Sequence, residues 1–288
     1  MKKHDFNKIT FAGVILVCLV QLYSSTAFGL SPLGPPRSLL KEDQNAFSID
    51  LGYSNMDLQT FGDMEITYLS PYSQSSSFTE FQIDNLKSTL VSARLDTNIF
   101  ENWDIFFRLG ISDGADEITE VQADGSTGHQ YNDFDGGFGV SWGLGTRTTF
   151  YAEGNTTWGG LFQVNWMNPG DSSITDASDS DFAGDINLDY WEVQLAIGPT
   201  VQYNNFRIYG GPFLQFINGD LEISGTTLSD DIIPLDIAVK ATHEIREESQ
   251  LGAYLGAQFN LGNDNTLVTE IQFTSDIWGI GIGSTWKF

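Results

Sequence analysis

Few side chains in this sequence could carry out catalysis or bind a metal ion. His129 and His243 lie far apart, and nothing in their spacing joins them into part of a metal site. Asp230 and Asp231 precede His243 in one segment, which is the best combination of acids with a histidine in the chain. Cys18 is the only cysteine, so disulfides and thiol chemistry have little support. We therefore predict a protein that is not an enzyme, with no catalytic residue, metal ligand or cofactor.

Acidic side chains gather in four long segments, 55–85, 113–133, 168–186 and 218–246. These segments hold 22 of the 38 Asp and Glu residues and very few bases. Divalent cations prefer carboxylate oxygens, which makes them candidate partners of these segments, but the simpler interpretation is that the acids keep the loops soluble. The chain has 13 Lys and Arg and a net charge of −25. A surface this acidic repels phosphate, which excludes nucleic acid as a partner.

The elements that must position these residues are strands. Polar and apolar residues alternate with a period of two, whereas no long segment shows a helical period. This pattern predicts an all-β protein of about ten strands, with eight or twelve as the alternatives. The expected strands are 46–54, 86–96, 103–112, 134–143, 148–167, 187–201, 206–217, 247–260, 266–275 and 277–288.

The connections between these strands alternate in length. The short connections are 97–102, 144–147, 202–205 and 261–265, with a final tight turn near Asp276. The four acidic segments are the long connections. Short turns at one end and long loops at the other are typical of a transmembrane antiparallel up-and-down β-barrel.

The seven tryptophans indicate where a membrane would lie. All of them fall on the apolar register of their strands, and indole rings prefer the headgroup level of a bilayer. We expect two girdles, with Trp103, Trp142 and Trp286 at the short-turn end and Trp166, Trp191 and Trp278 at the long-loop end. A sheet in lipid must close, because an open edge leaves unpaired backbone groups in hydrocarbon.

The polar strand face would line the lumen of such a barrel. An unpaired ion in a narrow lumen is costly to desolvate, so we predict that the inward charges pair. The predicted lumenal charge network consists of Arg94, Arg108, Arg207, Lys287, Asp50, Asp104, Glu153 and Glu270. Five rings share the inward register and predict a filled lumen with low conductance, namely Phe106, Tyr151, Tyr209, Phe213 and Tyr254.

The carboxyl terminus carries the most specific pattern. Phe288, Trp286, Ile282, Ile280 and Trp278 occupy alternate positions on one face, apart from an interruption at residue 284. This pattern resembles the C-terminal assembly signal of Gram-negative bacterial outer-membrane β-barrels. The resemblance implies a closed antiparallel barrel in the outer membrane. The implied partners are outer-membrane lipid, lipopolysaccharide and the barrel-assembly machinery.

The amino-terminal residues read as an export signal. Three lysines precede the apolar run Phe11–Val20, and Ala27-Phe28-Gly29 matches a signal-peptidase site. We therefore divide the chain into a signal peptide (1–29), a periplasmic lead-in (30–45) and an outer-membrane barrel (46–288). The alternative for the lead-in is a plug that enters the lumen.

These patterns favour a structural or surface-interaction barrel with acidic extracellular loops. One alternative is a narrow, porin-like channel that prefers cations. A second alternative is an outer-membrane enzyme, either a lipid-modifying enzyme or an omptin-like protease, a type whose chemistry relies on paired aspartates and a His-Asp couple. Asp230, Asp231 and His243 are the only candidates for the latter, and they share one loop, whereas omptin sites gather residues from opposite barrel walls.

Overall fold

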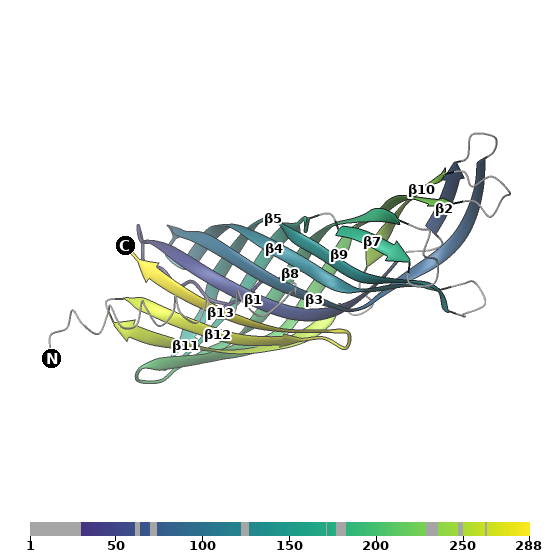
Figure 1. Cartoon of the computed structure of the whole chain (residues 1–288). Coiled ribbons are helices and arrows are strands. Elements are labelled where there is room, and N and C mark those ends of the chain that lie inside the picture. Colours follow the sequence, from purple (N-terminus) through teal and green to yellow (C-terminus); the bar gives the residue numbers. More distant parts are fainter. Residues whose placement is uncertain are drawn as a thin grey trace.

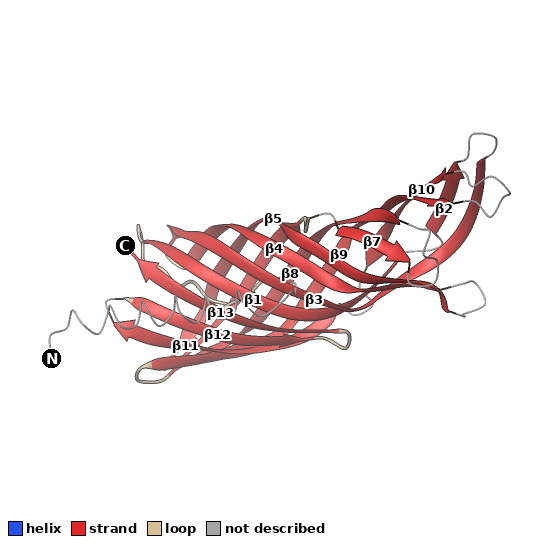
Figure 2. Cartoon of the chain, in the orientation of Figure 1, coloured by secondary structure: helices blue, strands red, loops and turns tan. Residues whose placement is uncertain are grey.

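The structure is a computed structural model, and it describes residues 30–60, 64–69, 74–121, 127–170, 172–176, 183–228, 236–246, 250–262 and 264–288. The regular structure of these residues consists of β-strands (Figure 2). No helix among them is long and apolar enough to cross a membrane. The expected signal peptide, residues 1–29, lies outside the described residues.

Ten strands close into an antiparallel barrel (Figure 1). Each pairs with the next in the ring, and the last pairs with the first from Ala46–Lys287 to Met56–Ile277. The expected all-β, ten-stranded barrel is therefore confirmed. The wall strands are β1 (Asn45–Thr60), β3 (Gln74–Phe100), β4 (Trp103–Val121), β5 (Thr127–Glu153), β6 (Thr156–Met167), β8 (Ala183–Gln202), β9 (Phe206–Leu228), β11 (Leu251–Gly262), β12 (Asn265–Phe273) and β13 (Ile277–Lys287).

One end of the barrel continues as paired strands well beyond the hairpin of β12 and β13 (Figure 1). Here β2 (Met64–Leu69), β7 (Ser172–Asp176) and β10 (Asp236–Arg246) join the long strands. The pairings run β2–β3–β4–β5–β7–β8–β9–β10 and return to β2, which closes a second ring. The expectation of four long loops is wrong for much of these segments, because their backbone N–H and C=O groups pair across extended hairpins. We call this the extended end.

The opposite end, which we call the turn end, carries the short connections and the carboxyl terminus (Figure 1). One of these turns differs from the sequence expectation. The chain reverses at Gly154 and Asn155, where Glu153 pairs with Thr156, and not at 144–147. Gly154 has a φ of 59°, a left-handed conformation that suits a two-residue hairpin turn. The strand β5 is consequently longer than predicted.

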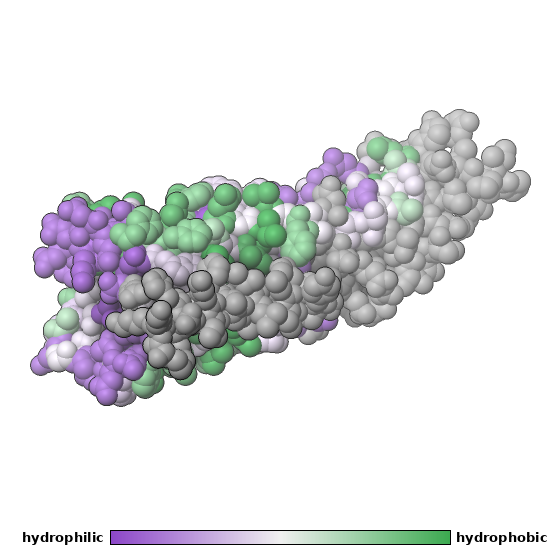
Figure 3. All heavy atoms as spheres, turned by 60° about the vertical axis from the view of Figure 1, so that its left-hand side comes forward, coloured by the Kyte–Doolittle hydropathy of each residue, from purple (hydrophilic) through white to green (hydrophobic). Residues whose placement is uncertain are grey.

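The outer surface of the barrel wall is apolar over a band that begins close to the turn end. On β4, Trp103, Ile105, Phe107, Leu109 and Ile111 all point outward and are exposed. In Figure 3 hydrophobic side chains cover the middle of the barrel wall, and hydrophilic residues lie at the turn end. The wall thus presents an apolar band next to a polar rim.

The tryptophans form two levels along this band, with one change from the prediction. Trp142 pairs with Trp166, which pairs with Trp191. Trp142 therefore belongs to the level nearer the extended end, because the true turn lies ten or more residues further along β5. The level nearer the turn end contains Trp103, Trp158 and Trp286.

The interior has two buried apolar clusters. One lies toward the extended end and includes Met56, Leu86, Leu188, Leu221 and Ile245. The other surrounds Tyr209, Phe213 and Tyr254, which are predicted inward rings. Phe106 is also buried, as predicted. Tyr151 is instead 51% exposed, because a strand irregularity between Thr149 and Tyr151 shifts its register.

Candidate functional site in the lumen

Residues 30–40 lie inside the barrel, and we call this segment the plug. Leu30, Ser31 and Leu33 are almost completely buried. This differs from the expected periplasmic lead-in and agrees with the alternative of a chain segment that enters the lumen. Pro32, Pro35 and Pro36 lack a backbone N–H, so an extended run here needs fewer hydrogen-bond donors satisfied. Asn45 then begins β1 at the turn end, beside Phe288.

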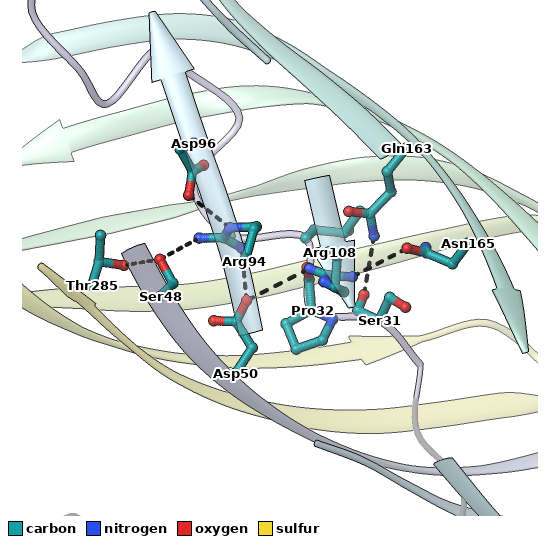
Figure 4. Close-up of polar contacts among 12 residues, drawn as sticks. Ser31, Pro32, Ser48, Asp50, Arg94, Asp96, Arg108, Gln163, Asn165 and Thr285 are labelled. Carbon is teal, nitrogen blue, oxygen red and sulfur yellow. Dashed lines mark hydrogen bonds and ion pairs between the residues drawn. The ribbon is translucent and has the colours of Figure 1, made fainter. Parts of the chain in front are cut away.

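The first plug residues are held by polar side chains from several walls (Figure 4). The N–H of Leu30 donates to Ser54 Oγ at 2.8 Å. The carbonyl of Ser31 accepts hydrogen bonds from Gln163 Nε2 at 3.3 Å and Gln272 Nε2 at 3.1 Å. Side chains from two separate parts of the barrel wall, β6 and β12, therefore bind the same backbone carbonyl, that of Ser31.

Arg108 holds the next plug residue. Its Nη2 donates to the carbonyl of Pro32 at 2.9 Å. The Arg108 side chain is 2% exposed, so this bond forms away from bulk water. A hydrogen bond that involves a charged group is stronger than a neutral one, and Arg108 thus fixes the plug at this depth.

Two carboxylates bind plug backbone groups rather than bases. Glu270 accepts the N–H of Leu33 at 2.9 Å and the N–H of Gly34 at 2.8 Å. Asp104 accepts the N–H of Leu39 at 2.5 Å and of Leu40 at 3.3 Å, and the hydroxyl of Ser38 at 2.8 Å. The prediction placed both acids in a side-chain charge network, but sequence alone could not show that a backbone segment would satisfy them.

Glycines on the wall make room for the plug. A side chain at Gly52 would collide with the carbonyl of Leu30, and one at Gly159 with the carbonyl of Pro36. The wall backbone and the plug backbone approach too closely for any Cβ at these positions. The lumen is therefore shaped to the plug along much of its length.

Charged side chains form a continuous chain beside the plug (Figure 4). Asp50 Oδ2 lies 3.0 Å from Arg94 Nη1 and 3.8 Å from Arg108 Nη2. Asp96 accepts from Arg94 Nε at 3.1 Å and from Arg147 Nη2 at 2.6 Å. Each carboxylate is thus shared by two guanidinium groups. This arrangement pairs buried charges of opposite sign, which offsets the cost of desolvation.

The side-chain amide of Asn165 links this chain of charged side chains to a further acid, Glu192. Arg108 Nη1 donates to Asn165 Oδ1 at 3.4 Å, and Asn165 Nδ2 donates to Glu192 Oε2 at 3.2 Å. Gln215 Nε2 also donates to Glu192 Oε1 at 2.9 Å. Asp50 and Asp96 thus pair directly with the three guanidinium groups, whereas Glu192 is joined to Arg108 only through the amide of Asn165.

The ring of Phe106 lies close to two cations of this ionic chain. The guanidinium carbons of Arg94 and Arg147 lie 5.4 Å and 4.9 Å from its centroid. Both distances are within the range of cation–π attraction. Phe106 also packs directly on Gly145 of β5, where a Cβ would overlap the ring. The aromatic ring thus fills space and stabilises charge at once.

Three predicted network members lie elsewhere. Arg207 donates to Gln258, and Lys287 donates to the carbonyl of Leu39. Neither forms an ion pair with a carboxylate of the described residues. Glu153 is exposed beside the Gly154 turn and bonds to the Tyr151 hydroxyl. Its prediction as a lumenal charge is wrong, because the real turn falls immediately after it.

The predicted charge network lacks three members of the ionic chain, Arg147, Asp96 and Glu192. Arg147 was assigned to a turn, although the alternation that places Gly143 and Gly145 inward continues through it. Asp96 shares the inward register of Arg94, two residues away, and this spacing could have identified it. Glu192 has the same signal on β8.

Among the described residues, no group of three or more His, Cys, Asp or Glu side chains could hold a metal ion. His243 lies on β10. Asp230 and Asp231 lie outside the described residues, as do several acids of the expected cation-binding loops, and the structure does not describe the His129 side chain. Divalent cations at the extended end stay a prediction.

The residues of the expected assembly signal lie on the outer wall of β13 and at its end. Ile280 and Phe288 are exposed, and Ile282 and Trp286 are partly exposed. Their register is the predicted one. Recognition by an assembly machinery stays a prediction.

No family model matches the chain, and no curated protein matches it. Among solved structures, the outer membrane protein OprG from Pseudomonas aeruginosa is similar at 11% identity, with 86% of this chain and 98% of that chain covered and a TM-score of 0.42. The outer membrane protease OmpT from Escherichia coli is similar at 10% identity, with coverage of 85% and 97% and a TM-score of 0.44. The transport unit of the autotransporter AIDA-I from Escherichia coli is similar at 10% identity, with coverage of 84% and 89% and a TM-score of 0.40.

Proposed function

We propose that this protein is an outer-membrane β-barrel whose lumen is closed by its own plug, and that it acts as a structural or surface-interaction protein. The observation that carries the proposal is the set of bonds between lumenal side chains and the plug backbone. Five lumenal side chains form hydrogen bonds with backbone groups of the plug, namely Asp104, Arg108, Gln163, Glu270 and Gln272. Groups that would line an ion path are thus occupied by the protein itself.

The outer wall supports a membrane location. Outward apolar side chains on β4 run from Trp103 to Ile111, nine residues, which matches the roughly 9–11 residues of a membrane-spanning strand. Tryptophans lie at two levels along the wall, as at the two interfaces of a bilayer. In this placement the turn end faces the periplasm and the extended end faces the medium.

The closed lumen supports a role other than transport. The plug fills the half of the lumen nearer the turn end, and the apolar cluster around Met56, Leu188 and Leu221 fills the extended end. An ion would have to pass both a hydrogen-bonded segment and a dry core, and the second would demand its full desolvation. The surface of the extended end is what the protein presents to partners.

Planar-bilayer recording tests the closed lumen. The full mature protein, reconstituted under a salt gradient, should give no steady current, while a wide porin inserted in the same way serves as the positive control. Large, steady, ohmic currents would contradict the proposal. A small cation-selective current would favour the narrow-channel alternative instead.

Two further assays test the rest of the proposal. Peptide and lipid substrates should not be hydrolysed, and turnover of either would favour the enzyme alternative. Phe288→Asp should leave the chain unassembled in the periplasm, detected by the loss of the heat-dependent gel shift of a folded barrel. Lys41→Asp, a change at an exposed residue near the same rim, should assemble normally. Equal assembly of both variants would contradict the role of the terminal aromatic residue.

A further inference from the structure

Two cations at the turn-end mouth of the lumen have no carboxylate partner. Arg207 Nη1 donates to Gln258 Oε1 at 2.8 Å, and its Nε donates to Gln202 Oε1. Lys287 Nζ donates to the carbonyl of Leu39. These oxygens orient the two cations but carry no charge, and the nearest negative charges acting on Lys287 are those of Asp264 and Asp104. No ion pair in the described part of the chain includes either of them.

The plug contributes a third cation to the same mouth. The backbone of Arg37 passes Gly159 on β6 so closely that a Cβ there would collide with it. The Nε of Arg37 is buried and has no hydrogen-bond partner. Arg37 and Lys287 both lie near enough to Arg207 for mutual repulsion. A buried donor without a partner is costly, and so are like charges held together.

A cavity of about 290 Å³ lies beside these cations, under the turn between β11 and β12. Its wall includes the two cations, Arg207 and Lys287, and two neutral polar residues, Asn260 and Thr266. Asp264 is the one carboxylate among its lining residues. It attracts Lys287, but within the described residues no ion pair joins it to either cation.

The other nearby acid is already occupied. Asp104 has both oxygens engaged by the plug and by Asn98 Nδ2. In a chain of net charge −25, this mouth is therefore a local excess of positive charge with unused N–H donors.

We propose that the turn-end mouth binds a small oxyanion, a phosphate or carboxylate group, between Arg207, Lys287 and Arg37. The guanidinium of Arg207 offers a planar pair of donors, which suits the oxygens of either group. Lys287 adds a point charge, and Asn260 and Thr266 add neutral hydrogen bonds on the cavity wall. The inference does not depend on whether the lumen conducts, because the site lies at its mouth.

Titration calorimetry with inorganic phosphate tests the site. The full mature protein is used in uncharged maltoside micelles at low ionic strength, since exposed charges are screened by salt. Phosphate should bind saturably. Arg207→Gln and Lys287→Gln should each weaken the affinity by about tenfold, because each removes a charged donor. Lys41→Gln removes the same charge from an exposed position outside the cavity and should leave the affinity unchanged. A heat-dependent gel shift confirms that every variant is folded.

A second arm distinguishes the source of the oxyanion. Phosphatidylglycerol or phosphatidylcholine is added to the micelles before the phosphate titration. If phosphate binding is lost when phosphatidylglycerol is added but not when phosphatidylcholine is added, the ligand is an anionic lipid headgroup. If phosphate binding persists in both lipids, the ligand is a soluble oxyanion. The proposal is overturned by absence of saturable phosphate binding in lipid-free micelles, or by an equal weakening in Lys41→Gln and Lys287→Gln.

Discussion

The two halves of strand β8 have opposite polarity patterns. Near the membrane band, Leu195 and Trp191 point outward while Gln194 and Glu192 are buried inside. Toward the extended end, Ile186 and Leu188 are buried inside while Asp185 and Asn187 point outward. The strand keeps its period of two, and only the assignment of polar and apolar residues to the two faces is exchanged.

The same exchange occurs on β9 and β1. On β9, Phe216 faces outward beside the buried Gln215, whereas further along Glu222 faces outward beside the buried Leu221. In the proposed membrane placement, one barrel wall therefore passes from a lipid environment to a watery one. The solvent around each level, and not the strand itself, decides which face is apolar.

The largest expected effect comes from breaking the ionic interior of the membrane part. Asp96→Ala removes the carboxylate shared by Arg94 and Arg147 and leaves two buried guanidiniums short of a counter-charge. The free energy of unfolding in detergent should fall by about 3–5 kcal/mol. Glu101→Ala, at an exposed turn, should change it by less than about 0.5 kcal/mol. Equal urea midpoints for the two variants would show that the buried ionic groups are hydrated and contribute little to the free energy of unfolding.

The apolar interior of the extended end should be almost as sensitive. Leu188→Ala deletes a side chain that is 1% exposed and should cost about 3 kcal/mol through lost burial and a cavity. The damage should concentrate at the extended end, so limited proteolysis should cut there while the membrane part stays folded. Ser224→Ala, an exposed position on the same end, is the control. Unchanged protease resistance in Leu188→Ala would argue against a packed core at this end.

A single charge on the outer face measures where lipid ends. Leu195→Arg places a cation midway along the apolar band of β8 and should destabilise the folded barrel by about 2–4 kcal/mol in lipid. Ala183→Arg lies on the same face of the same strand, at the extended end, and should cost less than about 0.5 kcal/mol. Unfolding titrations in lipid vesicles compare the two. A similar cost at both positions would remove the distinction between the two halves of the strand.

The smallest effect probes packing on one strand, β5. Gly145→Ala pushes a methyl group into the ring of Phe106 and should destabilise by about 1–3 kcal/mol. Gly137 has open space where a Cβ would stand, so Gly137→Ala should be nearly neutral. Thermal unfolding followed by the gel shift separates them. If both variants unfold at the same temperature, Phe106 has room to move and does not brace the two arginines.

Period-two patterning was sufficient to predict the barrel, because it is a local property of each strand. The outward Trp103 and the inward Arg94 follow from counting residues along one strand with a known apolar face. The closed form follows as well, since a lipid-facing sheet cannot leave an edge unpaired. The residues of the plug gave no such signal, because an extended proline-rich segment has no periodicity to read.

Tertiary structure alone decided which partner each inward charge would find. Asp50 meets Arg94 across β1 and β3, whereas Glu270 and Asp104 meet backbone N–H groups of a segment far away in the sequence. The position of one turn, at Gly154, moved Arg147 into the lumen and Glu153 out of it. A strand's face follows from its sequence, but what lies across a lumen depends on register and on contacts between distant segments, which no local pattern encodes.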